Sequence, residues 1–130
     1  NRCGECTKCI DSCPNGAITD SGINANRCIA YHTIENKAEQ LPADINLGGY
    51  VFGCDICQKA CPHNAHPQAK IKISDERIKQ LENIGTIDEP TFRKIRKNTV
   101  MDRIKYTQLT RNIDKNKNNK KELLIGENYG

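Results

Sequence analysis

Residues 3–14 read CGECTKCIDSCP, and this stretch organises the rest of the chain. Its cysteines follow the spacing C-x2-C-x2-C-x3-C-P, which is typical of loops that bind iron–sulfur clusters. Three cysteines at such short intervals allow one irregular loop to direct three thiolates toward a single [4Fe-4S] cluster. The fourth cysteine precedes a proline, so we expect it where the chain turns into a helix and faces a second cluster.

A second run, CDICQKACP at residues 54–62, supplies only three cysteines. Cys28 is the one remaining cysteine of the eight in the chain, and it completes the second set. In two-cluster bacterial ferredoxins each run lends its last cysteine to the cluster of the other run. By that rule one cluster is bound by Cys3, Cys6, Cys9 and Cys61, and the other by Cys28, Cys54, Cys57 and Cys13.

Two other uses of the cysteines fit the spacing less well. A pair of zinc sites would need cysteine knuckles about 15–20 residues apart. A disulfide framework would suit a secreted miniprotein, and the sequence shows no signal-peptide pattern. It also shows no apolar run of the ~18 residues that a membrane span needs. We expect a cytoplasmic protein, because a reducing compartment keeps thiolates available for iron.

The chain of 130 residues has the length of one domain, or of a small domain with an appendage. We predict a mostly α fold in three parts. Residues 1–69 form a module like that of two-cluster bacterial ferredoxins, with long loops. Residues 70–113 form short helices, and residues 114–130 form a basic, mobile tail. We expect the clusters to stabilise a chain that has few apolar residues for a core.

Local patterns place several elements within these parts. We expect a short helical turn over residues 14–18, followed by a turn over residues 19–22. Asn24 or Asn26 then caps a helix that includes residues 28–35. An extended segment at residues 50–52 leads into the second cysteine run. The sequence TIDE at residues 86–89 matches a capping box at the start of a later helix.

Three short motifs resemble the iron–sulfur half of epoxyqueuosine reductases: CIAYHTIE at residues 28–35, GCDICQ at 53–58 and CPHN at 61–64. The resemblance covers roughly residues 1–113 and includes LTRN at residues 109–112. It implies an oxidoreductase that completes queuosine synthesis in tRNA, with a cobalamin-binding catalytic domain before the clusters and HEAT-like helices after them. Because the chain starts at Asn1, only two residues before the first ligand, we expect it to be a fragment.

By this resemblance the chain relays electrons from a low-potential donor through both clusters to cobalamin in the upstream domain. We expect a monomer that acts on the anticodon arm of tRNA and has no catalytic residue of its own. Three alternatives stay open on the sequence. They are the electron-transfer part of a reductive dehalogenase-like enzyme, a free-standing ferredoxin, and a zinc-stabilised RNA-binding module.

Basic residues collect in the last third of the chain. Between Arg93 and Ile125 there are 11 Lys and Arg against 3 Asp and Glu, a net charge of +8. Such residues can contact an RNA backbone or can form a solvated helix face. The resemblance favours RNA, and we select Arg103, Lys105 and Arg111 as the contacts.

Five other polar residues occur near the cysteines. Where the resembled family usually has Leu and Trp, this chain has His32 and His63. Because eight cysteines already supply eight ligands, we expect packing or surface roles for both histidines. His66 has no role that we can assign. Asp55 and Gln58 lie between ligands, where each could tune a cluster or simply face solvent.

Overall fold

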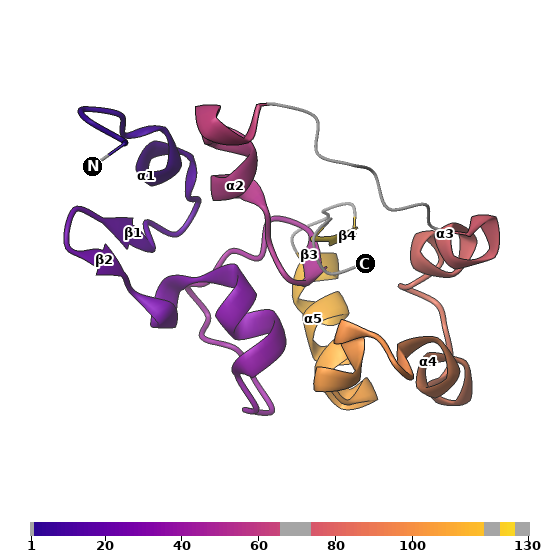
Figure 1. Cartoon of the computed structure of the whole chain (residues 1–130). Coiled ribbons are helices and arrows are strands. Elements are labelled where there is room, and N and C mark those ends of the chain that lie inside the picture. Colours follow the sequence, from indigo (N-terminus) through magenta and orange to yellow (C-terminus); the bar gives the residue numbers. More distant parts are fainter. Residues whose placement is uncertain (1, 66–73, 119–122, 127–130) are drawn as a thin grey trace.

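The computed structural model describes residues 2–65, 74–118 and 123–126. The elements in chain order are α1 (Lys8–Ser12), β1 (Ile18–Thr19), β2 (Gly22–Ile23), η1 (Ala25–Arg27), η2 (Tyr31–Glu35), β3 (Tyr50–Phe52), α2 (Ile56–Ala60), η3 (Pro62–Asn64), α3 (Asp75–Glu82), α4 (Glu89–Arg96), η4 (Val100–Arg103), α5 (Tyr106–Asn118) and β4 (Leu124–Ile125). Helices outweigh strands, and the two sheets have two strands each. Figure 1 shows α1, β1 and β2 at one side of the molecule, α3 and α4 at the other, and β3 and α5 between them.

The segment after the first cysteine run forms a small hairpin. Strands β1 and β2 pair antiparallel, with Ile18 opposite Ile23, and the predicted turn over residues 19–22 connects them. The predicted helical turn over residues 14–18 is wrong. Gly16 adopts a φ of 60°, which is outside the right-handed helical region, so the chain makes only a brief turn before β1.

The expected helix that includes residues 28–35 is present in a modified form. Asn24 accepts a hydrogen bond from the Asn26 backbone N–H and thereby caps η1. Next comes η2, a π-helix whose wider turn is closed by the Asn36 N–H and the Tyr31 carbonyl at 2.9 Å. The side chain of Ile34 in this segment is buried.

Strand β3 is completely buried and leads directly into the second cysteine run. It pairs in parallel with β4, where the Leu124 N–H donates to the Gly49 carbonyl and the Gly126 N–H to the Phe52 carbonyl. The predicted mobile tail over residues 114–130 is therefore wrong in part. Helix α5 continues to Asn118 and still has a buried residue at Asn116, and β4 pairs with β3; residues 119–122 and 127–130 lie outside the described residues.

One hydrophobic core joins the two parts that the sequence separates at residue 70. Short helices cannot bury their own apolar faces. Helix α5 packs on β3 and η2 of the cysteine-bearing module, and α4 packs on α5, so that both helices contribute to the same core. The core therefore holds the module and the helices together. Its buried members are Ile34, Val51, Phe52, Ile84, Phe92, Ile95, Met101, Ile104, Leu109 and Ile113.

Helix α4 begins two residues later than the capping-box pattern predicts. The side chain of Asp88 accepts a hydrogen bond from the Thr91 backbone N–H at 2.9 Å, which makes Asp88 the N-cap in place of Thr86. Hydrogen bonds from the side chain and the backbone of Thr91 hold the pKa of the Asp88 carboxyl below its usual value. Within the described parts of the chain, no helix is both long and apolar enough to cross a bilayer.

Candidate iron–sulfur centre

The two cysteine runs lie against each other because α1 packs on α2. None of the eight cysteines forms a disulfide; Cys3 and Cys6 are exposed, and the other six are partly buried. Cysteine sulfur is the ligand that [4Fe-4S] clusters take, four to a cluster. The donor set that the fold gathers therefore fits two such clusters.

Both runs follow the same backbone path. Helix α1 starts after Thr7, with φ −115° and ψ 8°, and α2 starts after Asp55, with φ −115° and ψ 9°. Each helix ends at the last cysteine of its run, where Cys13 and Cys61 share a φ of −73° and have ψ values of 115° and 121°. This extended conformation is the one that a following proline favours. The repeated spacing thus produces the same turn twice.

Four cysteines from three segments of the chain influence one another electrostatically. Burial raises the pKa of the Cys54 thiol to about 11 and also raises the pKa of Cys57. The charge of Cys28 raises both pKa values further, and Cys13 adds to the effect on Cys57. The last cysteine of the first run therefore lies near the second run. This proximity favours the crossed ligand set, which stays a prediction.

The buried thiols have consequences for metal loading. A raised pKa keeps a thiol protonated at neutral pH, whereas the thiolate is the form that binds metal. Iron binding must therefore release protons from Cys54 and Cys57. Backbone N–H groups of Ile56 and Gln58 oppose the shift by hydrogen bonding to these two sulfurs.

A further backbone donor points at the crossed cysteine. The Ala17 N–H donates to the Cys13 Sγ at 3.3 Å. Hydrogen bonds to sulfur are among the features that set the reduction potential of an iron–sulfur cluster. The described residues contain no group of three or more His, Cys, Asp or Glu side chains that could hold a single metal ion. A [4Fe-4S] cluster needs a wider arrangement, because each of its irons takes a different cysteine.

Of the two polar residues between ligands, Asp55 is buried and Gln58 is bound to the loop that follows α2. Asp55 is 3% exposed, which excludes a surface position for it. The Asn64 amide donates to the Gln58 carbonyl at 3.0 Å and to its Oε1 at 3.1 Å. Gln58 therefore fastens the turn after Cys61.

The two described histidines have structural partners. The ring of His32 is buried, with Nε2 2.7 Å from the Asn26 carbonyl and Nδ1 3.0 Å from the Asn36 amide. These contacts agree with the packing role that we predicted for His32. The Nε2 of His63 lies 3.3 Å from the Arg2 carbonyl at the surface. His66 is outside the described residues.

Sequence analysis missed a set of side chains on α5 that bind the backbone of the cysteine-bearing module. We call this set the α5 polar face. Its spacing of three and four residues normally marks an apolar helix face, which is why the pattern went unnoticed. The signal was polar residues at core spacing on a helix. The α5 polar face consists of Gln108, Arg111, Asn112, Lys115 and Asn116.

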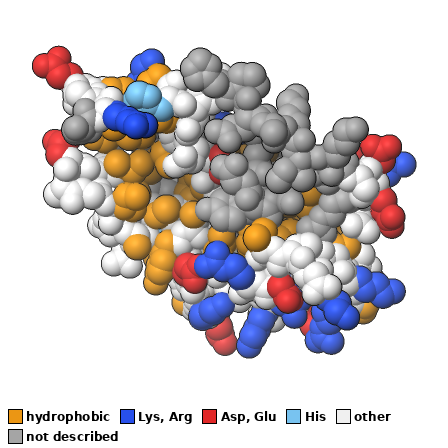
Figure 2. Space-filling model, viewed as in Figure 1, with side chains coloured by type: hydrophobic (Ala, Val, Ile, Leu, Met, Phe, Trp, Pro, Cys, Tyr) orange, Lys and Arg blue, Asp and Glu red, His pale blue; other side chains and the backbone are white. Residues whose placement is uncertain are grey.

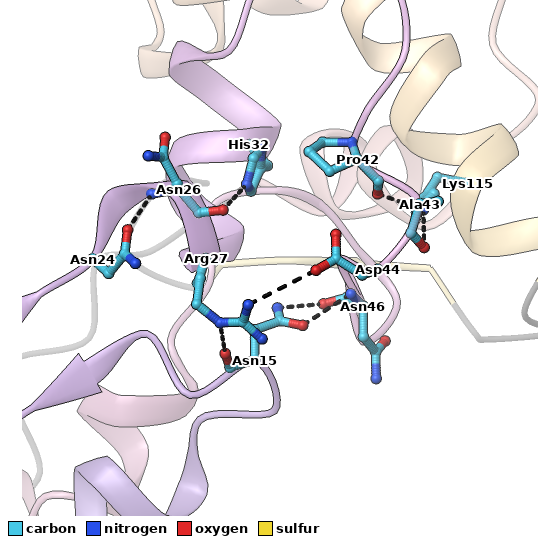
Figure 3. A network of polar contacts seen from close by, with 10 residues as sticks. All are labelled: Asn15, Asn24, Asn26, Arg27, His32, Pro42, Ala43, Asp44, Asn46 and Lys115. Atoms are coloured by element: carbon cyan, nitrogen blue, oxygen red, sulfur yellow. Dashed lines mark hydrogen bonds and ion pairs between the residues drawn. The ribbon is translucent and has the colours of Figure 1, made fainter.

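Figure 3 shows how this face reaches the segment after Cys13. The Lys115 Nζ donates to the carbonyls of Pro42 and Ala43 at 3.0 and 3.1 Å. In the same loop, the Asn46 backbone forms two hydrogen bonds with the side chain of Asn15, at 2.8 and 2.9 Å. Asn15 is buried and lies two residues after Cys13. The loop at residues 42–46 therefore connects the segment after Cys13 to α5.

The three basic residues selected as RNA contacts lie in different settings. Lys105 is exposed, and Arg103 is about half-exposed and pairs with Glu35. Arg111 is partly buried, and burial lowers the pKa of its guanidinium. All five of its N–H donors bind acceptors within the protein. These acceptors are the carbonyls of His32, Asn36 and Ala38 and the side-chain oxygen of Asn112. Of the three predicted RNA contacts, we therefore retain only Arg103 and Lys105.

Figure 2 shows Lys and Arg side chains along the lower edge of the molecule, over the region of α4 and α5, with acidic side chains between them. On α4 the Arg93 guanidinium pairs with Glu89, and Arg96 pairs with Asp102 beyond the helix. The edge is therefore mixed in charge, with basic residues in excess.

Residues 2–64 match the family of 4Fe-4S double cluster binding domains. The matched segment contains all eight cysteines, seven of them in the two adjacent runs and the eighth, Cys28, between the runs. Over most of its length the chain is homologous to the epoxyqueuosine reductases. It is 40% identical over 123 residues to the epoxyqueuosine reductase of Synechocystis, which covers 88% of this chain and 43% of that relative.

Two solved structures share the fold. Epoxyqueuosine reductase from Bacillus subtilis superimposes with a TM-score of 0.63 and 27% identity over 88% of this chain and 32% of its own. An epoxyqueuosine reductase in complex with an epoxyqueuosine-modified stem loop of tRNA-Tyr has a TM-score of 0.65 and 29% identity, over 87% and 32%. The chain thus spans less than half the length of each protein compared here.

Proposed function

We propose that this chain is the electron-transfer part of an epoxyqueuosine reductase. It passes electrons from a low-potential donor to cobalamin bound by another part of the protein. The observation that carries the proposal is the pairing of two cysteine runs, which with Cys28 supply eight cysteines and no disulfide, within a chain homologous to that enzyme along 88% of its length. The same homology favours this function over a reductive dehalogenase-like enzyme or a free-standing ferredoxin.

The cysteines would hold the two clusters in the crossed sets given above. When bound, [4Fe-4S] clusters supply one-electron transfer. The residues of this chain contribute the ligands, the N–H donors to Cys13, Cys54 and Cys57, and partial shielding from water. In this proposal the cysteine-bearing module is ferredoxin-like, and the α3–α5 region is the start of a HEAT-like helical array.

The proposed substrate is tRNA that carries epoxyqueuosine. The support is the stem loop bound to the structural relative and the excess of basic residues over α4 and α5. Arg103 and Lys105 are the proposed phosphate contacts. Such contacts release counterions from the RNA, so the binding they support weakens as salt is added.

Turnover experiments test the electron-transfer role. With clusters loaded, this chain should accept electrons from a strong reductant but leave epoxyqueuosine in tRNA unchanged, even with added cobalamin. The full-length protein should convert it, and Cys54→Ser in the full-length protein should abolish conversion. The matched control is Ser21→Ala, which removes an exposed hydroxyl in the turn between β1 and β2 and leaves every ligand in place. Turnover by the chain alone would place the catalytic site here and contradict the proposal.

Binding measurements test the RNA contacts separately. Replacing Arg103 and Lys105 by Ala should weaken tRNA binding and reduce the slope of log affinity against log salt by up to ~2 contacts. The double substitution Glu76→Gln and Asp75→Asn is a control that alters exposed charge on α3. An unchanged slope in the variant with Arg103→Ala and Lys105→Ala would show that this surface is a solvated helix face and does not contact RNA.

A further inference from the structure

The amides of Asn112 and Asn116 on α5 are completely buried, and both bind the backbone of β3. The Asn116 Oδ1 accepts from the Gly49 N–H at 2.9 Å, and its Nδ2 donates to the Tyr50 carbonyl at 2.9 Å. The Asn112 Nδ2 donates to the Val51 carbonyl at 2.9 Å. Two side chains one helical turn apart thereby fix three successive residues of the chain that leads to Cys54.

The same Asn112 amide also binds η2. Its Nδ2 donates to the Thr33 carbonyl at 3.0 Å, and so joins β3 to the segment that follows Cys28. Its Oδ1 accepts from the Nε and Nη2 of Arg111, at 3.1 and 2.9 Å. The amide is therefore satisfied on both sides, and a rotation of its side chain would break every one of these hydrogen bonds.

Thr33 binds the backbone of Gly53, the residue directly before the ligand Cys54. Its Oγ1 accepts from the Gly53 N–H at 3.0 Å and donates to the Ile29 carbonyl at 2.9 Å. Thr33 is completely buried. Gly53 has a φ of 71°, a left-handed conformation that favours glycine and turns the chain out of β3 into Cys54. The hydroxyl thus holds the peptide whose orientation sets the direction of the ligand loop.

We propose that Thr33 and Asn112 are positioning residues for Cys54. They fix the Val51–Gly53 backbone and so determine how the Cys54 sulfur meets the N–H donor of Ile56. Because hydrogen bonds to sulfur and ligand placement set cluster potential, the two residues tune the cluster held by Cys28, Cys54, Cys57 and Cys13. The cluster held by Cys3, Cys6, Cys9 and Cys61 has no corresponding support from α5 in the described chain. This inference rests on the proposed presence of two clusters.

Thr33→Val is the sharpest test, because valine keeps the shape of threonine and removes the hydroxyl. The anaerobically reconstituted protein is analysed for iron, its two reduced clusters are resolved by EPR, and each midpoint potential is measured by redox titration. We expect Thr33→Val to shift the potential and EPR signal of the cluster bound by Cys54 and to leave the other cluster unchanged. Thr33→Ser, which restores the oxygen, should return both readings to wild type.

Two further variants separate positioning from general stability. Asn112→Asp removes the N–H donors at nearly constant size and should affect the same cluster. Thr110→Val on α5 is the matched control, because the Thr110 hydroxyl only donates to the Thr107 carbonyl within that helix. We expect it to behave as wild type in both clusters.

The iron content, the midpoint potentials and the EPR signals of these variants decide for or against the proposal. If Thr33→Val or Asn112→Asp loses iron, loss confined to the cluster bound by Cys54 supports the proposal, and equal loss from both clusters overturns it. Wild-type potentials and EPR signals for both clusters in Thr33→Val would also overturn it. Absence of two clusters from the wild-type protein would instead refute the proposed function, and the iron analysis detects this before any variant is compared.

Discussion

The two cysteine runs have nearly the same backbone and different surroundings. At the first run, residues 3–8 are all exposed, including two of the ligands. The second run follows β3, whose three residues are buried and whose backbone is bound by the α5 polar face. The spacing of the cysteines therefore specifies the local turn, whereas the rest of the chain decides how firmly each turn is held. We expect two clusters of one type with different accessibility.

The difference also bears on the predicted role of Cys28 as a ligand. When the two runs are aligned on their last three cysteines, Val51 stands where the first run has Cys3. Val51 is completely buried in the core at the centre of β3. A core strand thus occupies the place of a ligand in the second run, which agrees with our prediction that Cys28, from a distant segment, supplies the fourth sulfur.

Exchange of the fourth cysteine should have the largest effect on this comparison. Cys13→Ser belongs to the first run in sequence, but we expect it to disrupt the cluster bound by Cys28, Cys54 and Cys57. Iron should fall from about eight to about four per chain, with the EPR signal of the other cluster retained. Cys61→Ser is the reciprocal variant and should spare the cluster that Cys13→Ser removes. Damage to the cluster of each cysteine's own run would show that the ligands are not crossed.

Removal of the guanidinium that joins α5 to η2 should have the next largest effect. Arg111→Ala leaves three carbonyls near η2 without their charged donor, so we expect the free energy of unfolding to drop by about 2–4 kcal/mol. The measurement is chemical denaturation of the cluster-loaded protein under anaerobic conditions. Arg103→Ala is the control, since it breaks a half-exposed ion pair with Glu35 and should cost about 0–1 kcal/mol. Equal losses in the two variants would show that Arg111 is no more structural than Arg103.

A smaller effect should appear in the rates at which the two clusters are lost. Because Cys3 and Cys6 are exposed, an iron chelator should remove the cluster that they hold several-fold faster than the cluster bound by Cys54. Time-resolved EPR of the reduced protein would follow the two signals separately. Asn116→Ala, which frees part of β3, should narrow the difference by accelerating loss at the second site. Equal rates of loss of the two clusters in the wild-type protein would contradict the claim that the second run is held more firmly than the first.

Patterns that depend on near neighbours could be predicted from the sequence. The turn at each cysteine run and the extended segment before Cys54 are both of this kind. Sequence analysis did not find the capping role of Asp88, because the TIDE pattern allowed two starting points for the helix. It also ended the ordered chain at residue 113, since the buried face of α5 beyond that point is made by Asn116, a residue that usually signals exposure.

The contacts that distinguish the two clusters could not be predicted for a further reason. The α5 polar face binds backbone carbonyls, and a carbonyl carries no signature in the sequence of the segment that it belongs to. The partners of Asn112 are 61 and 79 residues away along the chain. Only the fold brings them together. Arg111 is an example. Its charge led us to predict an RNA contact, whereas the structure shows its guanidinium hydrogen-bonded to acceptors within the protein.

Iron and sulfide analysis of the anaerobically reconstituted wild-type protein tests the central claim most directly. We predict about eight iron and about eight sulfide per chain, which two [4Fe-4S] clusters with four cysteine ligands each require. About four iron would mean that only one cluster forms. Stoichiometric zinc without sulfide would contradict the iron–sulfur function altogether.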